Sequence, residues 1–118
     1  MTTLPGAVVI RPAGDLDATA GPGFRRQVEQ AANTGAPLVV VDMTLVDFLD
    51  SAGLAALFGA NRLLLDGQRL ALANVPRRMH RVLQLTAVTT LMDVHEQGEP
   101  WPWPDLALDS SSTATPSV

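Results

Sequence analysis

Short runs of apolar, β-branched residues alternate with segments of helical periodicity, and this alternation most constrains the fold. Two such runs begin at Ala7 (AVVI) and at Pro37 (PLVVVD), and their continuous apolarity is typical of buried strands. Between them, Phe24 and Val28 are among the apolar residues that recur at helical spacing, and Thr19 is a candidate cap for this helix. The order strand, helix, strand predicts a parallel pair joined by a right-handed crossover.

The alternation continues along the chain. A second helix is predicted from Ser51 to the Asp-Gly pair at 66–67. The run RLALA predicts a further strand, and an amphipathic helix is expected after Pro76. Residues 91–94 indicate a last short element. The predicted apolar faces of the two helices consist of Leu54, Leu57, Phe58 and Leu65 in the first and Met79, Val82 and Leu83 in the second.

Composition excludes several classes of function. With 118 residues, 47% of them hydrophobic and 17% charged, the chain can form one modest core. The net charge of −4 argues against direct nucleic-acid binding, which needs clustered basic residues. The absence of cysteine excludes disulfides and thiolate metal sites. No apolar run reaches the roughly eighteen residues of a membrane span, so we expect a cytoplasmic protein without membrane insertion.

The C-terminal end has a different composition. Residues 98–118 are rich in Pro, Ser and Thr, so we expect a mostly disordered tail with the PWPWP segment extended. Trp101 and Trp103 are either a peptide ligand for a partner or, as we favour, packed against the surface of the domain itself.

The stretch VDFLDSAGLAALFG places a serine where the second helix begins. Asp50 or Ser51 is positioned to accept hydrogen bonds from the free amides of the first turn, which is a structural explanation of the pair. The same helix start would also stabilise a phosphate on Ser51, whereas the acidic Asp42, Asp47 and Asp50 nearby in the sequence would repel it. Gly59, in the middle of the helix, suggests that another group packs closely there. The turn is therefore either a helix cap or a phosphorylation switch.

Three segments, taken in order and spacing, resemble a known family. They are GDLDATAGPGFRRQVEQA, VVVDMTLVDFLDSAGLAALFGANRLL and LALANVPRRMHRVLQLTAV. They are similar to the STAS domain family, in particular to bacterial anti-sigma factor antagonists, over about residues 6–95. The D-S-x-G turn of that family matches Asp50 to Gly53.

The resemblance implies a single α/β, STAS-like domain over residues 1–97, with a mixed four- to five-stranded sheet and about four helices packed against it. It also implies partner switching. The unphosphorylated protein would bind an anti-sigma factor serine kinase and release a sigma factor, and phosphorylation of Ser51 would abolish this binding. A PP2C-type phosphatase is a further implied partner, no cofactor belongs to the protein itself, and its state is left open between monomer and weak dimer.

Site residues carry over position by position from the family. Asp17 matches the Asp of the early G-x-L-D segment, which lies near the phosphorylation site in the family, and Leu54 would begin the partner-facing helix. Ala52 stands where many members have a second Ser or Thr, which leaves Ser51 as the only acceptor in the motif. The implied partner-binding residues are Asp17, Asp50, Ser51, Ala52, Gly53 and Leu54.

Enzymatic alternatives lack essential parts, so we do not expect an enzyme. DLDAT at 15–19 fits the D-x-D-x-T pattern of haloacid dehalogenase-like phosphatases, but the chain contains no Lys to serve that chemistry. A serine hydrolase is disfavoured because Leu49 replaces the first glycine of the nucleophile elbow and neither His80 nor His95 has a motif around it. Within the family, a small STAS subunit of an ABC-type lipid-transport complex remains the alternative, since it too is a standalone domain.

Overall fold

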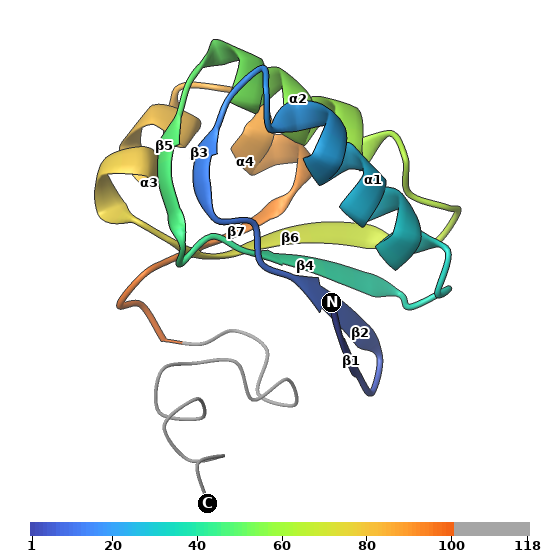
Figure 1. The fold of residues 1–118 in the computed structure, drawn as a ribbon. Coiled ribbons are helices and arrows are strands. Elements are labelled where there is room, and N and C mark those ends of the chain that lie inside the picture. Colours follow the sequence, from blue (N-terminus) through green and yellow to red (C-terminus); the bar gives the residue numbers. More distant parts are fainter. Residues whose placement is uncertain (101–118) are drawn as a thin grey trace, which may run out of the picture.

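The computed structural model describes residues 1–100, which form a five-stranded sheet, a two-stranded ribbon and four helices (Figure 1). Residues 101–118, with Trp101 and Trp103, lie outside the described residues. The strands are β1 (Thr2–Leu4), β2 (Ala7–Ile10), β3 (Gly14–Leu16), β4 (Leu38–Asp42), β5 (Val46–Leu49), β6 (Arg69–Val75) and β7 (Asp93–Glu96). The helices are α1 (Gly21–Ala32), α2 (Ser51–Asn61), α3 (Arg77–Gln84) and α4 (Val88–Leu91).

The main sheet is mixed, as expected. Its strand order is β1-β2-β4-β6-β7, in which only β1 runs antiparallel to its neighbour. The predicted strands β2 and β4 pair in parallel on either side of the α1 crossover, which confirms the strand, helix, strand unit. A mixed five-stranded sheet with four helices in the described part of the chain confirms the predicted α/β fold.

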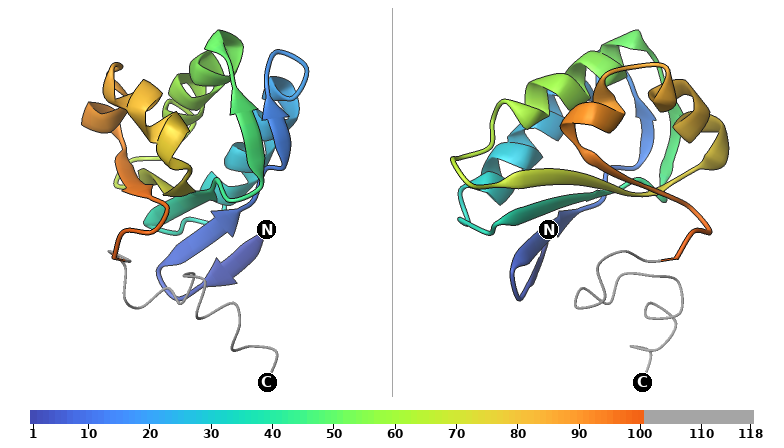
Figure 2. Two further views of the ribbon diagram at one scale, coloured as in Figure 1. Left: turned by 90° about the vertical axis from the view of Figure 1, so that its left-hand side faces the viewer. Right: turned by 180° about the vertical axis from the view of Figure 1, so that it is seen from behind.

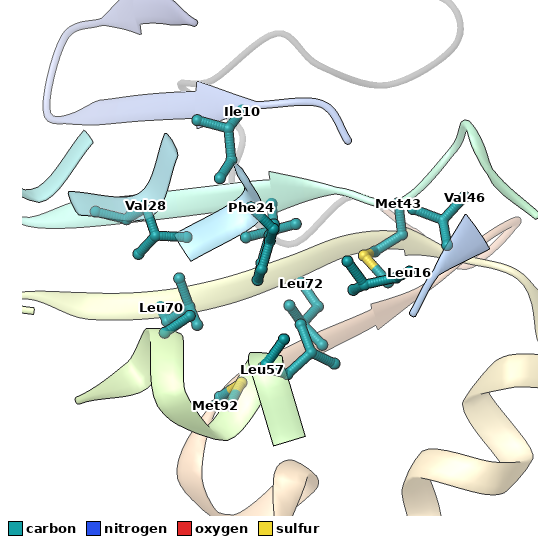
Figure 3. Close-up of a cluster of buried hydrophobic side chains, with 14 of the residues drawn as sticks. Ile10, Leu16, Phe24, Val28, Met43, Val46, Leu57, Leu70, Leu72 and Met92 are labelled. Carbon is teal, nitrogen blue, oxygen red and sulfur yellow. The ribbon is translucent and has the colours of Figure 1, made fainter. Parts of the chain in front are cut away.

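The helices pack on one face of this sheet, and the two further views in Figure 2 show them on the same side. Side chains in a strand point alternately to the two faces, so every second residue of β2, β4 and β6 faces the helices. Leu72 of β6 belongs to the same buried cluster as Phe24 of α1 and Leu57 of α2, and Figure 3 shows these side chains together. The main core therefore lies between the helices and the sheet.

Strands β3 and β5 form a separate parallel ribbon that the sequence patterns did not predict. Each is only three or four residues long, and each contains an exposed acidic residue, Asp15 or Asp47. Their inward residues Leu16 and Val46 are 2% exposed and belong to the main core. Short strands with one buried side chain or two carry too little periodicity to be read from the sequence.

The predicted start of α1 is wrong. The residue before the helix is Ala20, whose side chain cannot cap, and Thr19 is exposed. Asp17 supplies the bond instead, because its Oδ1 accepts a hydrogen bond from the amide of Ala20 at 3.0 Å. A side-chain bond from Asp17 to the amide three residues later thus replaces the predicted threonine cap.

Two predicted helical faces also need correction. Helix α2 ends at Asn61, and the following amides bond three residues back instead of four, as in a tightened last turn. Leu65 consequently lies outside the helix and is 52% exposed. In α3, Val82 is 52% exposed because the helix turns Met79 and Leu83 toward the core.

Candidate functional site

The ribbon of β3 and β5 brings the two predicted aspartates to the same end of the domain. In its parallel register Leu16 lies opposite Leu49, so the next residues along the two strands, Asp17 and Asp50, also emerge side by side. Each is followed by a helix, and Figure 1 shows β3 and β5 leading into α1 and α2. Residues 33 positions apart in the chain therefore lie at the same end of the ribbon.

Asp50 is the cap of α2. Its backbone is extended, and its Oδ1 accepts a hydrogen bond from the amide of Gly53 at 2.9 Å. Its carbonyl oxygen accepts the first helical bond, from the amide of Leu54, at 2.9 Å. Of the two capping candidates, Asp50 therefore performs this role.

Ser51 is consequently the first residue of the helix and not its cap. Its side chain is exposed, and Asp50 rather than its hydroxyl accepts the first-turn amide. The hydroxyl thus stands at the positively polarised end of an eleven-residue helix, in contact with solvent. That location is accessible to an enzyme that modifies serine.

Gly53 lets α2 approach the end of β3. A Cβ atom at this position would lie 1.9 Å from the carbonyl oxygen of Leu16 and 2.7 Å from Cδ1 of Leu49. Only a residue without a side chain fits there, so Gly53 fixes the position of the Ser51 turn against the ribbon.

Asp17 organises the opposite side of the turn. Besides the bond to Ala20, its carbonyl oxygen accepts a hydrogen bond from the amide of Gly21 at 2.9 Å. Asp17 and Asp50 are both half-buried. Each carboxylate is thus held by a backbone amide at the start of a helix, and both remain in partial contact with solvent.

The exposed surface beside the turn is partly apolar. Phe48 of β5 is 57% exposed, and Ala52 and Leu54 of α2 are half-buried, with Leu54 packed against the main core. Phe48 was not among the predicted site residues. Its signal in the sequence was its place in the unrecognised strand β5, two residues before Asp50.

Asp42 is not part of this turn, contrary to the sequence prediction. It accepts hydrogen bonds from Nε of Arg11 at 2.8 Å, from Nδ2 of Asn74 at 3.2 Å and from the amide of Thr44 at 3.0 Å. Burial alone would raise the pKa of Asp42, but bonds from Thr44, Arg11 and Asn74 outweigh it and hold the pKa below its usual value. Asp42 therefore ties together the ends of β4 and β6.

The described residues contain no arrangement for metal chemistry. Within residues 1–100, no group of three or more His, Asp or Glu side chains could hold a metal ion. Nδ1 of His80 lies 2.6 Å from Oε1 of Glu96, and Nδ1 of His95 lies 3.2 Å from the amide nitrogen of Asn74.

Among residues 1–100, no helix has the length and apolarity to cross a membrane.

Comparisons with known proteins identify the family of the chain. The model of the STAS domain family matches residues 1–99. An anti-sigma F factor antagonist of Paenibacillus polymyxa is 25% identical over 93 residues, covering 77% of this chain and 80% of that protein. The Bacillus cell fate determinant SpoIIAA in its phosphorylated form is 29% identical, with a TM-score of 0.58 and coverage of 80% of this chain and 86% of that one.

The fold is shared more widely. The STAS domain of a SulP transporter from Vibrio cholerae has a TM-score of 0.66 over 98% of this chain and 89% of its own, at 18% identity. At this low identity, the similarity to the transporter domain concerns the fold alone.

Proposed function

The chain belongs to the STAS domain family, and we propose that it acts as an anti-sigma factor antagonist by partner switching. The observation that supports this most is the exposed hydroxyl of Ser51, which stands at the start of α2 while Asp50 caps the helix. A serine with no capping duty is free to be modified without loss of the helix start. The relative from Paenibacillus polymyxa that is named an anti-sigma F factor antagonist supports the same role.

Phosphorylation would change the charge of this surface sharply. A phosphate on Ser51 adds about two negative charges beside two half-buried carboxylates, Asp17 and Asp50, and close to the exposed Phe48. The partial positive charge of the helix start stabilises the phosphate, so the modified domain stays folded. A partner that packs on the apolar part of the surface would instead have to desolvate a dianion, and it would be released.

In the proposed cycle, the unphosphorylated protein binds an anti-sigma factor that is also a serine kinase, and a sigma factor is released. The kinase phosphorylates Ser51 and thereby ends the interaction, and a PP2C-type phosphatase restores the binding form. The proposed contact surface comprises Asp17, Phe48 and the turn Asp50 to Leu54. The protein is a substrate in this cycle, needs no cofactor of its own, and acts in the cytoplasm.

Two substitutions at one position test the proposal, with a third as control. Ser51→Ala keeps the surface uncharged, Ser51→Asp adds a permanent charge, and Thr89→Asp adds the same charge at an exposed position in the first turn of α4. Binding to purified anti-sigma kinases of the host is measured by calorimetry. We expect Ser51→Ala and Thr89→Asp to bind as the unmodified protein does, and Ser51→Asp to bind at least about tenfold more weakly.

Equal affinity of the three variants for a kinase that binds the unmodified protein would refute the switch. Co-purification with a transport ATPase from host extracts, without any anti-sigma factor, would support the transport-subunit alternative instead.

A further inference from the structure

The main sheet has a second apolar face, on the side away from the helices. It is formed by Ala7, Val9, Leu38, Val40, Ala71 and Ala73, the alternate residues of β2, β4 and β6. All six are buried, with exposed fractions of 0–7%. Leu4 of β1 packs at the edge of this cluster.

No described helix accounts for that burial. Within residues 1–100 the second cluster contains strand residues only, whereas the main cluster includes residues from all four helices. Figure 2 shows the helices on the opposite side of the sheet in both views. A sheet face in contact with water normally alternates to polar residues, whereas Val9 and Val40 are apolar and at most 1% exposed. An apolar sheet face of this kind requires a further layer to pack against it, and the described helices do not supply one.

The chain leaves the described region at the edge of this face. In β7, Val94 packs against the main core, so the neighbouring His95 points to the second face, where it is 6% exposed. Nδ1 of His95 accepts a hydrogen bond from the amide of Asn74, so Nε2 donates to the carbonyl oxygen of Glu99 at 3.0 Å. The amide of Gln97 donates to the carbonyl oxygen of Val75 at 2.8 Å. These bonds hold the backbone just before residue 101 beside the second face.

The sequence after residue 100 contains large apolar residues of the kind that would cover an apolar face. It begins WPWPDLALD, with Trp101, Trp103, Leu106 and Leu108 among nine residues. The face itself presents the small side chains of three alanines, which leave room for large ones. Proline has no N–H to donate, so Pro102 and Pro104 favour packing through side chains over pairing as an extra strand.

The segment is also long enough. Neighbouring strands lie about 4.8 Å apart, so the distance from β7 across β6 and β4 to β2 is about 14 Å. An extended Pro-rich chain advances about 3.1 Å per residue, which gives nine residues a reach of about 28 Å.

We propose that residues 101–109 of the same chain cover the second face of the sheet, with Trp101 and Trp103 packed over the alanine and valine side chains of β2, β4 and β6. The segment then completes the fold as a third layer, and the surface around Ser51 stays free. This inference does not depend on the proposed function.

Tryptophan fluorescence tests the inference in the full-length protein, since Trp101 and Trp103 are the only two tryptophans. We expect a native emission maximum that is blue-shifted from that of the urea-unfolded chain, and shielding of both indoles from iodide. The variants Trp101→Phe and Trp103→Phe report on each indole separately. Emission and quenching equal to those of the unfolded chain would overturn the proposal.

Introduced cysteines test the covered face itself, because the chain has no cysteine of its own. Ala73→Cys lies on the second face and Ala60→Cys in the main core, and both alanines are fully buried. We expect slow thiol labelling of both. Adding Trp101→Ser and Trp103→Ser should speed labelling at position 73 by at least about tenfold and leave position 60 unchanged, because only the cover of the second face is loosened.

Labelling at position 73 that is unaffected by the tryptophan substitutions would overturn the proposal. Protection that instead rises with protein concentration, together with a dimeric mass in light scattering, would also overturn it and identify a second copy as the cover.

Discussion

The two glycines of α2, Gly53 and Gly59, differ in the space available for a side chain. A methyl group at Gly53 would lie 1.9 Å from the carbonyl oxygen of Leu16, whereas one at Gly59 would lie 3.6 Å from Cδ of Arg25, an ordinary contact. The close packing suggested at Gly59 by the sequence is therefore found at Gly53. It explains in physical terms why the motif ends in glycine.

We predict that Gly53→Ala lowers the free energy of unfolding by about 3 kcal/mol, since the helix must move away from β3. Gly59→Ala should raise the free energy of unfolding by about 0.5–1 kcal/mol, because alanine favours the helix and nothing obstructs it. Urea denaturation followed by circular dichroism measures both. A neutral Gly53→Ala would contradict the described approach of α2 to β3.

Asp42 makes stability depend on pH. Its pKa is lowered in the folded state, so the ionised carboxylate stabilises the fold above its unfolded pKa of about 3.9, and this contribution is lost as the pH falls through the folded pKa. We predict that Asp42→Asn lowers the free energy of unfolding by about 1–3 kcal/mol at neutral pH, because Arg11 loses its charged partner.

The difference in unfolding free energy between the unmodified protein and Asp42→Asn should shrink as the pH falls below about 4. Denaturant titrations at several pH values measure this difference. Asp66→Asn, at an exposed turn position, is the matched control and should have little effect at any pH. A cost of Asp42→Asn that is independent of pH would contradict the charge-based account of Asp42.

At the scale of a single element, two neighbouring residues at the start of α2 have different roles. Asp50 caps the helix, and Ser51 is the proposed phosphorylation site. We predict that Asp50→Ala destabilises the protein by about 1 kcal/mol, because the amide of Gly53 loses its acceptor. Ser51→Ala should change the free energy of unfolding by less than about 0.5 kcal/mol, since alanine is a better helix former than serine and the cap remains. Thermal or urea unfolding compares the two. A larger loss for Ser51→Ala than for Asp50→Ala would return Ser51 to the capping role.

Elements with strong periodicity were predictable from the sequence, and those that depend on tertiary contacts were not. Strands β2, β4 and β6 were visible as apolar runs, and α1 as a repeat of buried residues. The ribbon of β3 and β5 was missed because its strands are only three and four residues long and pair with each other across more than thirty positions of the chain, which no local pattern records. The end of α2 was misplaced because Leu63 and Leu64 pack against the core after the helix has ended.

At the candidate site too, some features were predictable from the sequence and others required the structure. The D-S-x-G turn and Asp17 were expected from the family resemblance, and the structure places them together through the parallel register of the ribbon. The choice between Asp50 and Ser51 as cap needed the backbone geometry at Asp50. The exposure of Phe48 and the commitment of Asp42 to Arg11 and Asn74 also needed the three-dimensional arrangement.

At the scale of the whole molecule, the sheet divides the protein into two sides. The helices and the ribbon lie on one side and present the Ser51 turn at one end, while the apolar face formed by β2, β4 and β6 lies on the other (Figures 1 and 2). A modification at Ser51 therefore alters a local surface, and the sheet needs no rearrangement to respond. This arrangement suits a domain whose partner is selected by charge.

The central claim is that Ser51 is a phosphoryl acceptor, and intact-mass spectrometry with site mapping tests it most directly. The protein and its Ser51→Ala variant are each incubated with ATP and candidate anti-sigma kinases of the host, with an antagonist of known reactivity as the control for kinase activity. We predict one added phosphoryl group on Ser51 and none on the variant. A folded protein that stays unmodified by every kinase active on the control, or that is modified elsewhere, would contradict the account.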